Sequence, residues 1–321
     1  MPQPLPNLYI AQLLPEPVMA AIREGFRLTV TPGTSPPPRQ ALLDGLRQAQ
    51  AAICTLTERI DEEVLAAAPH LRVLANYAVG YNNVALDAAQ ARGVIVTNTP
   101  DVLTETTADL TWALLLATAR RIPEGDSLVR QGLWTGWGPT QMLGAEVSGK
   151  RLGIIGMGRI GRAVARRSTG FGMTVCYATR RDSRASSVDP SWLHLPFEEV
   201  LAQSDFISLH VPLTADTHHL IGSAQLRRMR PTAFLINTSR GAVVDEAALV
   251  EAVRAGWIAG AGLDVYEREP DLHPVLRELR QVVTLPHLGS ATLGTRVRMG
   301  MVCLENIRAV LEGRPAPNRV M

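Results

Sequence analysis

Arg240 and His287 each follow an apolar stretch of the chain and carry a charge or a transferable proton, and a third apolar stretch, at 260–265, is followed by the acids Glu267 and Glu269. An imidazole can donate a proton to a carbonyl oxygen near neutral pH, and a neighbouring carboxylate favours the protonated ring. A guanidinium can bind a carboxylate through two parallel hydrogen bonds. These three residue types are what the reduction of a 2-keto acid to a 2-hydroxy acid requires. Taken singly, each is more often an ordinary surface or loop residue.

The elements that would position these residues alternate between apolar runs typical of strands and stretches with helical spacing. In the second half the strand-like runs are residues 151–155, 173–177, 206–210, 233–237, 260–265 and 282–284. In the first half they are residues 7–11, 51–54, 73–77 and 94–97, separated by helix-like stretches at 17–25, 39–48, 61–68 and 84–92. A long helix is expected at 104–121 and a closing helix at 292–312. Strands alternating with helices predict parallel α/β sheets, whose ligands bind beyond the carboxyl ends of the strands.

A glycine-rich turn follows the strand at 151–155. Gly156, Gly158 and Gly161 form a G-x-G-x-x-G pattern that includes Arg159 and Ile160 and leads into a helix. The first glycine permits a tight turn, the second a close approach of a pyrophosphate, and the third close packing of helix on strand. In this strand–turn–helix setting the pattern predicts a dinucleotide-binding site.

The end of the next strand bears on the choice between NAD and NADP. Thr179 stands where an NAD site normally places an acid for the ribose 2′-hydroxyl, and Arg180 and Arg181 follow it. Guanidinium groups pair with a 2′-phosphate, which a carboxylate would repel. We therefore predict that NADP(H) is favoured over NAD(H), with Arg180 the stronger candidate. The alternative is that both arginines belong to a solvated loop end.

The bulk properties exclude several classes of protein. The chain has 321 residues, 46% of them hydrophobic, and a formal net charge of +2 without a long run of like charge, so a nucleic-acid-binding arm is not expected. The apolar helical stretch at 110–119 is too short to span a bilayer, and the N-terminus lacks the pattern of a signal peptide. The three cysteines show no metal or disulfide spacing, and the neighbours His218 and His219 lack a carboxylate pattern. We expect a cytoplasmic protein of about two domains without a metal site.

Read together, these segments resemble the D-isomer-specific 2-hydroxyacid dehydrogenase family, most closely its glyoxylate/hydroxypyruvate reductase branch. The resemblance rests on residues 76–83 (NYAVGYNN), the glycine turn, the Arg240 strand, the pair Glu269-Pro270, and residues 286–292 (PHLGSAT). The resemblance covers nearly the whole chain. One departure is Asn83, which stands where many relatives have aspartate.

The resemblance implies a role for each site residue. His287 would be the general acid in reduction, Glu269 would hydrogen-bond it and keep it protonated, and Arg240 would bind the substrate carboxylate and polarise the carbonyl. Glu269 is chosen over its neighbour Glu267 because the acid of the family directly precedes proline. Backbone N–H groups of Val79 and Gly80 would bind the same carboxylate, with Ser290 as a further contact. The remaining implied cofactor contacts beyond the glycine turn and the arginines are Thr107, Val211, Pro212, Thr217, Thr238, Ser239, Arg240, Asp264, His287 and Gly289, with Asp264 near the nicotinamide carboxamide.

The resemblance also implies an architecture. Two Rossmann-like, doubly wound parallel domains are expected, with a dinucleotide-binding domain at 100–287 inserted into a discontinuous flavodoxin-like substrate domain at 1–99 and 288–321. The segment with Trp134 and Trp137 is too apolar for a solvated linker, and in relatives it belongs to the dimer contact. A homodimer is therefore expected.

The implied reaction is the NADPH-dependent reduction of glyoxylate or hydroxypyruvate to the D-2-hydroxy acid. Glu269 argues against formate oxidation, because formate dehydrogenases of this fold have glutamine there, whereas phosphite oxidation stays open. A bulkier 2-keto acid or 2-ketogluconate is an alternative substrate. A different class of function, a non-catalytic NAD(P)-sensing scaffold on the same fold, is also open.

Overall fold

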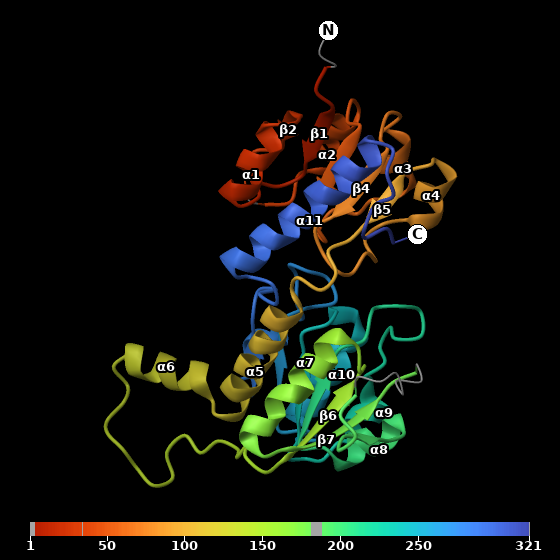
Figure 1. Cartoon of the computed structure of the whole chain (residues 1–321). Coiled ribbons are helices and arrows are strands. Elements are labelled where there is room, and N and C mark those ends of the chain that lie inside the picture. The colour runs from red at the N-terminus through yellow and green to blue at the C-terminus, as the bar shows by residue number, and fades with distance from the viewer. Residues whose placement is uncertain (1–3, 34, 181–187, 321) are drawn as a thin grey trace. The chain divides into compact units, whose positions relative to one another are not determined.

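The computed structural model describes residues 4–33, 35–180 and 188–320. The chain folds into two compact units (Figure 1). Unit 1 comprises Met1–Leu103 and Ser290–Met321, and unit 2 comprises Thr104–Gly289. Each unit contains one parallel sheet, which confirms the predicted α/β fold class with two doubly wound parallel domains.

Unit 1 is built on a five-stranded sheet in the order β2-β1-β3-β4-β5, the order of flavodoxin-like folds. Its strands are β1 (Asn7–Ile10), β2 (Arg27–Val30), β3 (Ala51–Cys54), β4 (Val73–Asn76) and β5 (Ile95–Thr97). Its helices are α1 (Glu16–Arg23), α2 (Arg39–Leu46), α3 (Glu62–Ala66), α4 (Leu86–Ala91) and α11 (Leu293–Leu311). The closing helix α11 packs against β4 and β5, so the end of the chain completes the unit in which the chain begins.

Unit 2 is built on a seven-stranded sheet in the order β12-β11-β10-β9-β6-β7-β8. Its strands are β6 (Arg151–Ile155), β7 (Thr174–Ala178), β8 (Leu193–His194), β9 (Phe206–Leu209), β10 (Phe234–Asn237), β11 (Gly260–Leu263) and β12 (Val282–Thr284). Its α-helices are α5 (Thr104–Ala119), α6 (Ile122–Arg130), α7 (Arg159–Arg167), α8 (Phe197–Gln203), α9 (Ser223–Arg228) and α10 (Glu246–Arg254). The strand order reverses direction at β6, between β7 and β9. That reversal is the topological switch point at which dinucleotides bind in Rossmann folds.

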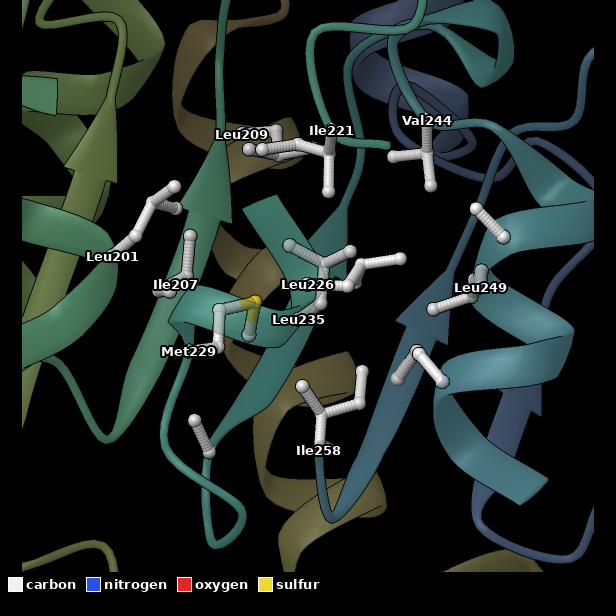
Figure 2. Close-up of a cluster of buried hydrophobic side chains, with 14 of the residues drawn as sticks. Leu201, Ile207, Leu209, Ile221, Leu226, Met229, Leu235, Val244, Leu249 and Ile258 are labelled. Carbon is white, nitrogen blue, oxygen red and sulfur yellow. The ribbon is translucent and has the colours of Figure 1, made fainter. Parts of the chain in front are cut away.

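Helices cover both faces of the unit 2 sheet, which is why its strands are nearly continuous apolar runs. Figure 2 shows one of the two cores, where Leu209 and Leu235 of the sheet meet Leu226 of α9 and Leu249 of α10. On the other face, Trp112 of α5 donates its indole N–H to the carbonyl of Val164 in α7 at 2.9 Å. Burial of each large apolar side chain contributes about 1.5–3 kcal/mol, so the strand ends that carry the candidate residues are firmly held.

Helix α5 is apolar but short. Two of its threonines form hydrogen bonds within the helix, because the hydroxyls of Thr111 and Thr118 donate to the carbonyls of Thr107 and Leu114, each at 2.8 Å. Among the described residues, no helix combines the length and the apolar character that crossing a membrane requires.

Candidate active site

The glycine turn joins β6 to α7 in unit 2, and each glycine meets a different constraint. Gly156 has φ +98°, a backbone conformation that other residues rarely adopt. A Cβ at Gly161 would lie 2.2 Å from the carbonyl oxygen of Gly156, so helix and turn are in backbone contact. A Cβ at Gly158 would meet no atom within 4 Å, so the turn is open where a pyrophosphate would approach. The first-turn residues Arg159 and Ile160 follow, and the turn therefore fits a dinucleotide phosphate group.

The second candidate element of the cofactor site lies after β7. Thr179 and Arg180 follow this strand directly, and Arg181 lies outside the described residues. The guanidinium of Arg180 is exposed and pairs with the carboxylate of Asp216 at 2.5 Å. Asp216 belongs to the loop after β9, the strand on the other side of β6. Arg180 is thus held near the switch point by Asp216, a partner that the sequence did not reveal.

His287 and Glu269 are in direct contact in unit 2. The imidazole Nδ1 lies 2.7 Å from Oε2 of Glu269, and the other carboxylate oxygen accepts the backbone N–H of Tyr266 at 3.1 Å. The backbone of His287 has φ +56° and donates its N–H to the carbonyl of Asp264 at 3.0 Å. Both side chains are about one quarter exposed. The ring is therefore fixed through Nδ1, which leaves Nε2 for a reacting group.

Arg240 follows β10 and is held by its own loop. Asn237, the last residue of β10, donates its side-chain amide to the carbonyl of Arg240 at 2.9 Å, and its side-chain oxygen accepts both the N–H and the hydroxyl of Ser239. Burial lowers the pKa of the Arg240 guanidinium, and the negative charge of Glu269 acts in the opposite direction. Arginine stays protonated in proteins despite such a shift. The three predicted catalytic side chains, Arg240, Glu269 and His287, thus belong to one unit. The negative charge of Glu269 interacts with both Arg240 and His287.

The loops that carry Arg240 and Glu269 touch through their backbones. A Cβ on Gly241 would lie 1.8 Å from the carbonyl carbon of Tyr266. The loop that carries Arg240 continues directly into the short helix η2 (Gly241–Val243). Glycine at this position is therefore required for the two loops to approach each other.

Asp264 anchors the segment after His287. Its two carboxylate oxygens accept the N–H groups of Leu288 at 2.6 Å and of Gly289 at 2.8 Å. Burial raises the pKa of Asp264, whereas these two N–H groups and the nearby His287 lower it. The carbonyl of Gly289 in turn accepts the hydroxyl of Thr107 at 3.1 Å. Asp264, Thr107 and Gly289 are thus brought together as predicted cofactor contacts, and Asp264 also has a role in holding the loop.

The other predicted cofactor contacts line two further strand ends of unit 2. Val211 and Pro212 follow β9, where the hydroxyl of Thr217 donates to the carbonyl of Pro212 at 2.6 Å. A Cβ on Gly156 would approach Val211 to 2.9 Å, so this loop borders the glycine turn. Thr238 follows β10 and shares a hydrogen bond of 2.8 Å with Thr111.

The predicted residues Val79, Gly80 and Ser290 belong to unit 1. Two asparagine side chains, those of Asn98 and Asn76, bind the carbonyls of Val79 and Gly80 at 2.8 and 2.7 Å. Within the described part of the chain, the N–H groups of these two residues donate to no protein atom. They are therefore available to an anion. Asn83 donates its side-chain N–H groups to the carbonyls of Thr55 and Glu58, so this amide ties two loops of unit 1 together.

The other histidines differ from His287 in their settings. Desolvation lowers the pKa of the half-buried His210 to about 3, so its ring is neutral at physiological pH. His219 stacks on His218 and contacts Glu267 at 2.8 Å rather than Glu269. Over residues 4–33, 35–180 and 188–320, no group of three metal-ligating side chains is placed to hold an ion.

Three asparagines that hold the candidate loops were missed from the sequence: Asn76, Asn98 and Asn237. The signal that could have found Asn76 and Asn237 is an asparagine that ends an apolar strand, since a buried amide at that point needs partners in the following loop. Asn98 donates to a carbonyl 19 residues earlier in the chain, and no local pattern marks it.

Comparison with known proteins adds family information to this geometry. Residues 112–289 match the family model described as the D-isomer specific 2-hydroxyacid dehydrogenase, NAD binding domain. A glyoxylate reductase of Thermococcus gammatolerans is 48% identical over 319 residues, which is 98% of this chain and 96% of that protein. A glyoxylate reductase of Korarchaeum cryptofilum is 48% identical over 320 residues, with the same two coverages.

Solved structures agree with this result. The crystal structure of a Thermus thermophilus protein superposes with a TM-score of 0.92 at 46% identity, covering 98% of this chain and 100% of that one. An NADPH-dependent glyoxylate/hydroxypyruvate reductase from Sinorhizobium meliloti, solved with NADP and malonate, gives a TM-score of 0.86 at 33% identity and covers 99% of this chain and 97% of that one.

Proposed function

Because the chain belongs to the D-isomer-specific 2-hydroxyacid dehydrogenase family of oxidoreductases, we propose that it reduces a small 2-keto acid, glyoxylate or hydroxypyruvate, to the D-2-hydroxy acid with NADPH. The observation that carries this proposal is the 2.7 Å contact between His287 and Glu269 in the unit that also holds Arg240 and the glycine turn. A nucleotide-sensing scaffold would need the glycine turn but not this proton-transfer pair.

His287 acts as the general acid in this proposal. NADPH supplies the hydride that attacks the carbonyl carbon of the keto acid. As the C=O bond becomes C–OH, the oxygen takes a proton from Nε2 of His287, and the ring returns to its neutral form. Glu269 stabilises the protonated ring beforehand and keeps it in one orientation through Nδ1.

Arg240 binds the substrate carboxylate and polarises the carbonyl. A planar guanidinium can contact two oxygens at once, and partial burial strengthens the interaction because water screens it less. The N–H groups of Val79 and Gly80 and the hydroxyl of Ser290, all in unit 1, are proposed as further donors to a bound carboxylate. No metal is needed for this step, since Arg240 and protonated His287 stabilise the developing alkoxide.

The glycine turn is proposed to hold the pyrophosphate of the dinucleotide. Gly156, Gly158 and Gly161, with the N-terminal N–H groups of α7 at Arg159 and Ile160, offer an open backbone cradle to the anion. Val211, Pro212, Thr217, Thr238, Ser239, Asp264, Gly289 and Thr107 would line the remainder of the cofactor, together with Arg240 and His287.

The preference for NADPH is proposed to depend on Arg180 and Thr179. Replacing Arg180 by alanine should lower kcat/KM for NADPH by about 10-fold or more, because a charge-assisted hydrogen bond to a phosphate is worth about 1.5–3 kcal/mol. The same change should leave kcat/KM for NADH within about twofold, since NADH has no 2′-phosphate. Steady-state kinetics with both cofactors at saturating glyoxylate measure the ratio.

Arg228→Ala serves as the matched control, because Arg228 is similarly exposed and also pairs with a carboxylate, that of Glu198 at 3.1 Å. A wild-type enzyme that prefers NADH, or an Arg180→Ala variant that keeps the full NADPH preference, would overturn the proposed cofactor choice and leave the reaction itself standing.

The reaction is tested with the purified chain, NADPH and a panel of 2-keto acids. Glyoxylate and hydroxypyruvate are expected to be reduced, and the glycerate formed from hydroxypyruvate should be the D-isomer. Faster turnover of a branched keto acid or of 2-ketogluconate would show that the enzyme acts on a bulkier keto acid than proposed. If the protein binds the cofactor but neither reduces any keto acid nor oxidises phosphite, the result would favour a non-catalytic nucleotide-sensing scaffold.

We also propose that the protein is a cytoplasmic homodimer formed through α6 and the segment that follows it. Figure 1 shows this segment projecting from the sheet of unit 2, and no residue of α6 is buried. Large apolar side chains are exposed along it: Ile122, Val129, Leu133, Trp134, Trp137 and Leu143. Trp137 is 84% exposed, and a cluster of this kind in one segment is typical of a protein–protein contact.

The triple variant Leu133→Ser, Trp134→Ser and Trp137→Ser should shift the protein from dimer to monomer in sedimentation velocity, because buried aromatic residues carry most of the binding energy at interfaces. Leu13→Ser removes an exposed apolar side chain of unit 1 and should leave the dimer intact. A wild-type monomer at micromolar concentration would refute the proposed dimer.

A further inference from the structure

Glu246 is the first residue of α10 and is only 8% exposed. Its two carboxylate oxygens accept backbone N–H groups from two different points of the chain: Oε1 from Glu267 and Oε2 from His273, each at 2.7 Å. Glu267 and His273 are the two ends of the loop that carries Glu269. One buried carboxylate therefore ties both ends of this loop to one helix.

The helix that carries Glu246 is fixed by its N-terminal cap and by core packing. Asp245 caps α10 by accepting the N–H of Ala248 at 3.0 Å, and its own N–H donates to the carbonyl of Ile221 at 3.0 Å. Val244 and Leu249, on either side of Glu246, point into the hydrophobic core shown in Figure 2. The position of the Glu246 carboxylate is thus fixed by core packing and not by a mobile surface segment.

The contact is reinforced from the loop side. The N–H of Glu246 donates to the carboxylate of Glu267 at 3.1 Å, which makes the link between the two residues reciprocal. The same Glu267 oxygen lies 2.8 Å from Nε2 of His219, in the segment after the predicted cofactor loop. Glu269 is two residues from this doubly held point and, through its own carboxylate, contacts His287.

We propose that Glu246 is a positioning residue for the reduction, and that it acts through Glu269 by fixing the loop that presents this carboxylate to His287. The inference rests on the proposed function of the Glu269–His287 pair. Its chemical basis is that a carboxylate is an acceptor only, so it can serve two backbone N–H donors at once. Misplacement of a proton-transfer pair by about 1 Å can cost up to about 100-fold in rate.

Glu246→Gln is the diagnostic change, because it keeps the size of the side chain but places an NH2 group against one of the two backbone donors. We expect kcat/KM for glyoxylate to fall about 10-fold, while the Kd for NADPH, measured by fluorescence titration, stays within about twofold. Glu251→Gln is the matched control: Glu251 is on the same helix, exposed, and pairs only loosely with Arg227 at 3.5 Å. It should match the wild type in both measurements.

A second variant removes one donor and leaves Glu246 intact. His273 has φ −54°, which proline can adopt, and proline has no N–H. His273→Pro should therefore lower kcat/KM in the same direction as Glu246→Gln, by about threefold or more. This variant keeps the inference testable if Glu246→Gln fails to fold.

A double-mutant cycle separates positioning from a general loss of structure. Glu269→Gln alone should lower kcat/KM strongly, and adding Glu246→Gln to it should cause less than about a twofold further loss. Equal losses in both backgrounds, or no loss from Glu246→Gln alone, would overturn the role of Glu246 while leaving that of Glu269 intact. If Glu269→Gln itself leaves turnover unchanged, the proposed function fails and this inference fails with it.

Discussion

Replacing His287 by glutamine should lower kcat for glyoxylate reduction by about 10²–10⁴-fold, the usual contribution of a positioned general acid. The glutamine amide can still donate a hydrogen bond to the substrate oxygen, but it cannot transfer a proton at neutral pH. The loss should therefore appear in kcat more than in the Kd for NADPH, which we expect to stay within a few-fold of the wild type. Stopped-flow measurement of a single turnover would separate the chemical step from product release.

The control for this prediction is His70→Gln, since His70 is an exposed histidine of unit 1. It should retain wild-type activity. A His287→Gln variant with more than about one tenth of the wild-type kcat would show that His287 is not the proton donor. His210 could not then take its place, because desolvation lowers its pKa to about 3 and its ring is neutral at physiological pH.

Replacing Arg240 by alanine should lower kcat/KM for glyoxylate by about 10²–10⁴-fold. Two charge-assisted hydrogen bonds to the substrate carboxylate, at about 1.5–3 kcal/mol each, account for this range. Both kcat and KM should be affected, because Arg240 is proposed to polarise the carbonyl as well as to bind the carboxylate. Arg240→Lys should be only partly active, since an ammonium keeps the charge but cannot contact two oxygens with a planar fork.

Chemical rescue gives this prediction a readout that a folding defect would not produce. Guanidinium ion at millimolar concentration should restore part of the activity of Arg240→Ala and none of that of Arg240→Lys, whose side chain occupies the space. Arg227→Ala, which removes an exposed arginine stacked on Trp257, should neither lose activity nor respond to guanidinium. A change in KM alone would show that Arg240 binds the ground state and the transition state equally.

Much of the fold could be predicted because most strands are buried on both faces and therefore read as apolar runs. The runs at 151–155 and 282–284 coincide with β6 and β12, and the other predicted strands of unit 2 lie within about two residues of the observed ones. Strand β2 (Arg27–Val30) was missed because its residues are exposed or half-buried at the edge of the sheet. The two-residue strand β8 was missed because it is exposed and too short to show a pattern.

The candidate site was predictable only where a side chain had to follow a strand. The glycine turn, Arg240 and His287 carry local signals of that kind, and the family resemblance supplied Glu269. The partners of these residues lie far away along the chain: Asp216 is 36 residues from Arg180, and Glu246 is 27 from His273. Such pairs depend on how the strands are ordered in the sheet, which a single sequence does not reveal.

The backbone contact at Gly241 sets a limit on how this enzyme could be re-engineered. The loops of Arg240 and Glu269 touch where any side chain on Gly241 would collide with the peptide of Tyr266. Any substitution of Gly241 would therefore push apart the loops that carry Arg240 and Glu269, the residues proposed to bind the substrate carboxylate and to keep His287 protonated. Variants designed for larger 2-keto acids would have to keep Gly241 and change other side chains around the substrate.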